Sequence, residues 1–282
     1  MYVAKIFVLF VLSIIPFVCN SSGIIKCKDS AGNIVFTQNK SDCNSSVEHK
    51  EVKLSKRVQL LDKTKISYRI PNRDYIQEKG KWDIRVESVL LDGDPELYRS
   101  SLVKLNNVLD DIFSILPARA SEELSSLTVF LMWGESSPNG GRKSGMSYIR
   151  KGEPDNYHYL DPSWGHSLVI YSAKNFMYLN DTWSRKAVVH EVSHAWHITN
   201  WPEKHPPIYN SWVNAKKSNR YTDVQDTKGK IIKNAYARKN QLEYFAELSA
   251  IYFVGGNYYP FNRRGLEMYD PKGYKMVRGL WQ

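Results

Sequence analysis

The chain has 282 residues, of which 42% are hydrophobic and 24% charged, and its formal net charge is +10 at neutral pH. This length allows one domain with a sizeable core beside smaller segments. The positive charge favours anionic partners, but the sequence holds no recognisable nucleic-acid-reading motif and no internal repeat. We therefore expect neither a nucleic-acid partner nor a repeat protein.

Residues 1–22 have the layout of a signal peptide. A lysine precedes the apolar run Ile6–Val18, and small polar residues follow it. Because this run is shorter than the ~20 residues that a membrane span needs, we predict cleavage near Ser21 or Ser22 and no stable membrane span. A retained membrane anchor is the alternative. The chain is therefore expected to be exported.

Residues 23–45 are predicted to form a small β-hairpin module, in which two strand-like runs flank a turn at Asp29–Asn33. Cys27 and Cys43 remain as an even pair after cleavage, and in an oxidising compartment they are candidates for a disulfide. The segment resembles DUF4124, a module of bacterial exported proteins that begins like I-Y-K-C-x-D-x-x-G. This resemblance implies a periplasmic or secreted bacterial protein and says little about activity.

Residues 46–67 are polar and charge-rich, and we interpret them as a linker. Residues 68–282 are expected to form one α+β domain. The hydrophobic patterns predict, in chain order, a strand at Trp82–Leu91, a helix at Pro95–Leu116, a buried strand at Leu127–Trp133, a loop at Ser136–Gly145, a strand at Ser167–Tyr171 and a last helix after Pro271.

The segment His190-Glu191-Val192-Ser193-His194 has the pattern H-E-x-x-H inside a predicted helix, Asp181–His197. Its two histidines share one helix face about 6 Å apart along the axis, so both imidazoles can bind one zinc ion. Glu191 lies beside them, where a carboxylate can take a proton from a metal-bound water. An ordinary structural helix is the alternative, but this pattern arises by chance in such a chain on the order of once in a hundred.

A basic insert, residues 202–233, follows this helix. Its side chains could attract acidic peptides, an anionic envelope surface or lipid headgroups, or they could form an ordinary solvated face. The basic residues are Lys204, His205, Lys216, Lys217, Arg220, Lys228, Lys230 and Lys233.

A catalytic zinc site needs a third protein ligand. His197 is about 10.5 Å further along the helix than His190, too far for the same ion, and we interpret it as a histidine that lies at the surface or supports a metal ligand. Glu243 is the better candidate, because Asn240–Val254 predicts an apolar helix on which Glu243 and Glu247 share a face. Glu247 would then accept the free N–H of a ligand histidine. A solvated acidic edge is the alternative.

These residues resemble the gluzincin metallopeptidases of the anthrax lethal factor and Pro-Pro endopeptidase group, over about a quarter of the chain. The resemblance implies a zincin-like domain with a mixed sheet, zinc as cofactor and an edge strand above the zinc, for which Ser167–Tyr171 is the candidate. A tyrosine seven residues before the third ligand stabilises the oxyanion in that group. The matching residues here are His190, Glu191, His194, Tyr236, Glu243 and Glu247.

We therefore expect an exported zinc-dependent endopeptidase that acts on a peptide or protein. Glu191 would activate the zinc-bound water and pass its proton to the leaving amine, while Tyr236 would donate a hydrogen bond to the oxyanion. Two alternatives remain: a zinc amidase that acts on cell-wall peptides, and a catalytically inactive secreted binding protein on the same scaffold.

Overall fold

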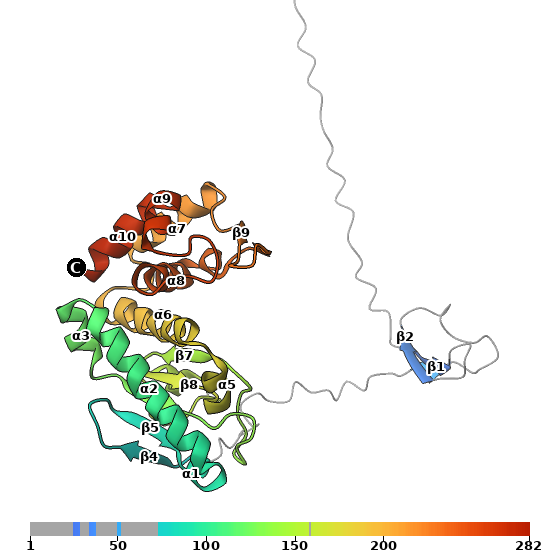
Figure 1. Ribbon diagram of the computed structural model, residues 1–282. Helices are drawn as coiled ribbons and strands as arrows, with labels where there is room; N and C mark the ends of the chain where they lie inside the picture. Colours follow the sequence, from blue (N-terminus) through green and yellow to red (C-terminus); the bar gives the residue numbers. More distant parts are fainter. Residues whose placement is uncertain (1–24, 29–33, 38–49, 52–72, 158) are drawn as a thin grey trace, which may run out of the picture. The chain divides into compact units, whose positions relative to one another are not determined.

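The computed structural model describes residues 25–28, 34–37, 50–51, 73–157 and 159–282 (Figure 1). The chain divides into two compact units, Met1–Ser67 and Tyr68–Gln282. The predicted signal peptide, residue Cys43 and most of the predicted linker lie outside the described residues.

The first unit contains the predicted hairpin. Strands β1 (Ile25–Lys28) and β2 (Ile34–Thr37) pair antiparallel, and the register sets Cys27 opposite Val35. A third strand, β3 (Lys50–Glu51), pairs with the other side of β1. This strand falls within the range predicted as linker, so the small sheet continues beyond residue 45. Because Cys43 is not described, its pairing with Cys27 stays a prediction.

The second unit is built around a five-stranded sheet in which β5, β6 and β8 run parallel while β4 and β7 run antiparallel at the two edges. This mixed sheet, together with the helices around it, confirms the predicted α+β class. The strand order is β4 (Tyr75–Glu78), β5 (Ile84–Glu87), β6 (Thr128–Leu131), β8 (Ser167–Ile170) and β7 (Met146–Ile149).

The prediction that Ser167–Tyr171 forms the edge strand was wrong. Ser167–Tyr171 contains β8, which lies inside the sheet with all four of its residues buried, and the edge strand next to it is β7. An unbroken run of buried residues is typical of an interior parallel strand, whereas β7 (Met146–Ile149) is mostly half-buried. The strand predicted over Trp82–Leu91 also ends early, at Glu87, where helix α1 (Ser88–Gly93) begins.

Residues of the central strands alternate between the two faces of the sheet. Val129 and Leu131 belong to the large core beneath the helices, whereas Phe130 and Met132 point into a smaller cluster on the opposite face with Trp164. The large core is covered by α2 (Pro95–Ile115), α5 (Ala173–Tyr178) and α6 (Asp181–Asn200), with α3 (Ala118–Leu124) packed on α6. Two short helices, α4 (Glu153–Asn156) and η2 (Pro162–Trp164), lie between β7 and β8 in the chain.

A buried carboxylate anchors the loop that leads into β7. Glu87, at the end of β5, is fully buried, and its Oε1 accepts hydrogen bonds from Ser137 Oγ at 2.8 Å and from Arg73 Nη1 at 3.1 Å. Its Oε2 accepts a bond from Trp133 N at 2.9 Å. The loop predicted at Ser136–Gly145 is therefore tied to the sheet at its start, and this helps to position the edge strand that follows.

The C-terminal third is mainly helical. Helix α8 (Gln241–Phe253) packs against α6 and is surrounded by α7 (Pro206–Lys217), α9 (Arg263–Tyr269) and α10 (Pro271–Trp281), as Figure 1 shows. The range predicted as a basic insert folds into α7 and a hairpin of β9 (Asp223–Gln225) and β10 (Ile231–Lys233). Of the helices in the described ranges, none combines the length and the hydropathy needed to span a bilayer.

Candidate metal centre

Two capped helices carry the residues that the sequence analysis selected. Helix α6 begins after Asn180, whose side chain accepts a hydrogen bond from Trp183 N, and it continues without proline or glycine through His190 and His194. Helix α8 begins after Asn240, whose Oδ1 accepts from the backbone N–H of Glu243 at 2.9 Å. This cap holds Glu243 in the first turn of α8, facing α6.

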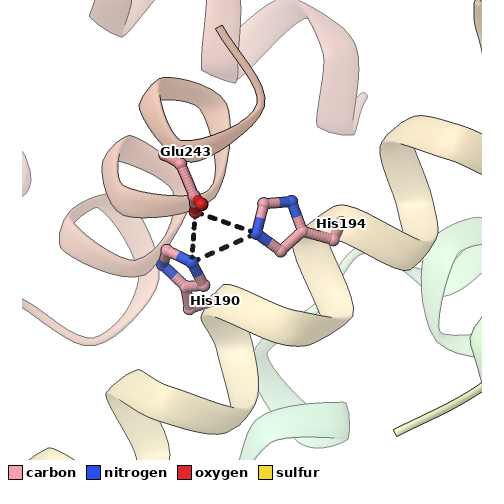
Figure 2. A group of neighbouring side chains, drawn as sticks. All are labelled: His190, His194 and Glu243. Carbon is pink, nitrogen blue, oxygen red and sulfur yellow. Dashed lines mark hydrogen bonds and ion pairs between the residues drawn. The ribbon is translucent and has the colours of Figure 1, made fainter. Parts of the chain in front are cut away.

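The structure brings His190, His194 and Glu243 together (Figure 2). Oε2 of Glu243 lies 3.1 Å from Nε2 of His190 and 3.2 Å from Nε2 of His194, and the two nitrogens are 3.2 Å apart. Zinc bonds of 2.0–2.1 Å in a tetrahedral arrangement place neighbouring donor atoms about 3.3 Å apart. The three residues can therefore hold a metal ion.

Glu247 lies on the far side of His190 and is almost fully buried. Its Oε1 is 3.0 Å from Nδ1 of His190, while its Oε2 accepts from Lys186 Nζ at 3.1 Å and from Tyr258 Oη at 2.6 Å. A carboxylate in this place accepts a hydrogen bond from Nδ1–H of the imidazole, which fixes the tautomer and directs the lone pair of Nε2 toward the metal position. Glu247 thus occupies the place that the sequence analysis predicted.

Sequence reasoning missed Lys186 and Tyr258. Lys186 is four residues before His190 on α6 and has a side chain only 9% exposed, and it also donates to Asn257 Oδ1 at 2.7 Å. Its position could have indicated this role, because a lysine on the same helix face as a buried ligand needs a partner of opposite charge. Tyr258 carried no such signal, since it follows α8 in an irregular segment.

The carboxylates create a field that favours cations. Burial opposes charge on His190, but Glu243 and Glu247 outweigh it and raise the pKa of His190 to about 10. Burial likewise opposes charge on Glu247, yet His190 and Lys186 lower its pKa to about 2. The pKa of Glu243 lies well below its ordinary value despite burial, because both histidines donate to it. The proton retained on His190 lies where a metal bond would form.

Glu191 points from α6 toward the edge of the sheet. Its Oε2 accepts a hydrogen bond from the backbone N–H of Tyr148 in β7 at 2.8 Å. Since Glu191 and the three candidate ligands line the same cavity of about 370 Å³, this carboxylate stands beside the metal position and is held by the edge strand.

The outer edge of β7 opens onto this cavity. Gly145 O accepts from Tyr171 N at 3.1 Å, so odd-numbered residues pair with β8 and even-numbered ones turn their backbone groups outward. Of these outward groups, Tyr148 N–H is taken by Glu191 and Arg150 N–H by Glu153 at 2.9 Å. Met146 and the Tyr148 carbonyl have no hydrogen bond on this side among the described residues, so the edge can accept an extended chain.

Tyr236 also lies at the cluster, in the short helix η3 (Tyr236–Arg238), and its side chain is half exposed. Its hydroxyl donates to Oε1 of Glu243 at 3.0 Å, the oxygen that faces away from the two histidines. Lys239 Nζ lies 3.1 Å from this hydroxyl. The residue selected for the oxyanion is therefore adjacent to the metal position and bonded to a candidate ligand.

His197 is not part of the site, and the prediction that it lies at the surface or supports a metal ligand was wrong. It is fully buried, its ring lies 5.6 Å from that of Phe245, and its Nε2 is 3.3 Å from Pro202 O. Burial lowers the pKa of His197 to about 4. The error arose because α6 is covered by other elements on several sides, although its sequence looks partly polar.

Comparisons with family models, curated proteins and solved structures found no match to this chain. Function is therefore inferred from the chemistry of the site itself.

Proposed function

We propose that the protein is a zinc-dependent endopeptidase of gluzincin type, with a zincin-like arrangement of edge strand, H-E-x-x-H helix and glutamate helix. The observation that carries this proposal is the meeting of three donor atoms, at mutual distances of 3.1 to 3.2 Å, in one cavity with the carboxylate of Glu191 and a free strand edge.

The donor set suits zinc. Two neutral imidazoles and one carboxylate form the usual set for a catalytic zinc of this type and leave one coordination position open. His190, His194 and Glu243 would hold the ion, and Glu247 would fix the tautomer of His190. When bound, zinc supplies a Lewis acid that polarises a carbonyl and lowers the pKa of a water molecule toward about 7.

Glu191 is suited to move the proton in peptide hydrolysis. It would take a proton from the attacking water as the water oxygen bonds to the carbonyl carbon, then give that proton to the amide nitrogen as the C–N bond breaks. Because Tyr148 N–H holds Oε2 of Glu191, the other oxygen remains for this transfer. Tyr236 would turn its hydroxyl from Glu243 to the oxygen of the tetrahedral intermediate.

The edge strand favours a peptide as substrate. An extended backbone that adds to β7 would bond to the outward groups of Met146 and to the Tyr148 carbonyl. This would place a substrate amide between β7 and α6, where Glu191 lies. We also propose that residues 1–22 direct export and are then removed. The exposed lysines of residues 202–233 would attract an anionic envelope surface.

The experiment compares wild type, Glu191→Gln and Glu243→Ala for zinc content and for cleavage of a proteome-derived peptide library, read by mass spectrometry. We expect about one zinc per chain in wild type and Glu191→Gln, cleavage by wild type alone, and loss of zinc from Glu243→Ala. Glu267→Gln, an exposed glutamate of α9, is the matched control and should behave as wild type.

Full activity of Glu191→Gln would contradict the mechanism. Zinc binding without cleavage of any peptide, but with release of cell-wall fragments, would favour the amidase alternative. Zinc binding without any hydrolysis would favour a binding protein.

A further inference from the structure

Lys239 completes a triangle of polar atoms at the candidate metal centre. Its Nζ lies 3.0 Å from Oε1 of Glu243 and 3.1 Å from the hydroxyl of Tyr236, and that hydroxyl lies 3.0 Å from the same Oε1. The ammonium group also stands 4.6 Å from the centroid of the Tyr236 ring. Lys239 therefore contacts both a candidate ligand and the residue proposed for the oxyanion.

The two oxygens of Glu243 have separate partners. Oε2 faces His190 and His194, whereas Oε1 accepts only from Tyr236 and Lys239 among the described residues. A carboxylate whose second oxygen is occupied by two donors binds a metal through the first oxygen alone. Without those donors, the second oxygen is free to swing onto the ion and raise its coordination number.

The hydroxyl of Tyr236 has one proton, and in this structure that proton forms the hydrogen bond to Oε1 of Glu243. To reach a substrate oxygen, Tyr236 must release Oε1, and at that moment Lys239 is the donor that still holds this oxygen. An ammonium group with three donors can serve the carboxylate and the phenol oxygen at once.

We propose that Lys239 is a positioning residue that keeps Glu243 bound to the metal through one oxygen and frees Tyr236 for the substrate. The part that concerns Tyr236 rests on the proposed peptidase function. The part that concerns Glu243 depends on metal binding alone, so the two can fail separately.

The test uses cobalt(II) as a probe, because its visible absorption is stronger in four-coordinate sites than in five-coordinate sites. We expect Lys239→Met to bind cobalt with a clearly weaker band than wild type, since Oε1 of Glu243 loses one of its two donors and joins the ion more readily. Lys239→Arg, which keeps a charged donor, should restore the band. Lys275→Met, at an exposed lysine of α10, is the matched control. The Lys239 side chain is 54% exposed, so its substitution leaves the core intact.

Activity gives the second readout. With a peptide that wild type cleaves, Lys239→Met should lower kcat about tenfold with little change in KM, a smaller loss than that of a direct oxyanion donor. A cobalt spectrum and a kcat both equal to wild type would overturn the proposal. A weaker band in Lys239→Met together with no cleavage by wild type would uphold the role toward Glu243 and reject the peptidase. An unchanged band with reduced kcat would reject the role toward Glu243.

Discussion

Oε1 of Glu247 lies 3.0 Å from Nδ1 of His190, and this contact joins α8 to α6 directly behind the candidate metal position. The same glutamate binds Lys186 and Tyr258 through its other oxygen. One buried carboxylate thereby orients a ligand on a neighbouring helix and satisfies a buried lysine, so its substitution should affect both metal affinity and stability.

The first prediction concerns metal affinity. Glu247→Gln keeps the size of the side chain but removes its charge, which weakens the bond to His190 Nδ1 and the basicity of Nε2. We expect zinc affinity to fall about 10- to 100-fold. Competition with a chromophoric chelator measures the change, and Glu267→Gln should leave the affinity unaltered. Equal affinity in both variants would show that Glu247 does not support the metal.

The second prediction concerns the buried ion pair. In Lys186→Met, the buried charge of Glu247 is opposed only by neutral donors and by His190. This substitution should therefore lower the free energy of unfolding of the metal-free protein by about 3 kcal/mol. Urea denaturation in the presence of a chelator measures this loss. The double variant Lys186→Met/Glu247→Gln should be more stable than Lys186→Met, and a double variant that is less stable by the full sum of both losses would contradict the pairing.

The third prediction is a dependence of stability on pH. The buried imidazole of His197 has a pKa lowered to about 4, below the 6.5 of an exposed histidine. As the pH falls from 6.5 toward 4, the unfolded chain takes up a proton at this position and the folded chain does not. The contribution of His197 is therefore complete above pH 6.5 and is lost in acid, by about 3 kcal/mol at most.

His197→Phe removes this titration while it keeps a ring against Phe245. Urea midpoints of the metal-free variant should decline less between pH 7.5 and pH 5 than those of wild type, and His205→Gln is the matched control for a less buried histidine. Parallel decline in wild type and His197→Phe would refute this role of burial.

The fourth prediction concerns Tyr157, an aromatic residue in the wall of the cavity. Tyr157 lines the cavity, is 46% exposed, and its ring lies 5.5 Å from that of Tyr159. It offers a face to a ring-bearing side chain of a substrate, a contact of about 0.5–1.5 kcal/mol. Tyr157→Ala should raise KM about three- to tenfold for peptides with an aromatic residue near the cleaved bond, as steady-state kinetics would show. Tyr178→Ala, exposed but outside the cavity, should have no effect.

Much of the candidate site could be predicted from sequence because its geometry is local. His190 and His194 share a face through helix periodicity, and the same holds for Glu243 and Glu247. That the two pairs face each other is a tertiary fact, which the need for a third ligand and the resemblance to a known peptidase group suggested. The structure agrees with that suggestion in the positions of these four residues.

The rest could not be predicted, since it depends on contacts between distant residues. Strand order is set by pairing across the sheet, so the short and mixed sequence of β7 (Met146–Ile149) gave no sign that it forms the edge. The burial of Lys186 depends on Glu247, 61 residues later in the chain. In the sequence, Lys239 is one of many lysines that are expected at the surface. Its contact with the Tyr236 hydroxyl is visible only in the structure.

The candidate ligands come from two layers of the second unit. His190 and His194 belong to α6, which rests on the sheet, and Glu243 belongs to α8, around which α7, α9 and α10 gather (Figure 1). An ion bound between them would link the C-terminal helices to the layer formed by α6 and the sheet. Metal supply would then affect stability as well as catalysis: a molecule without its ion would unfold more readily and would be cleaved more often by surrounding proteases.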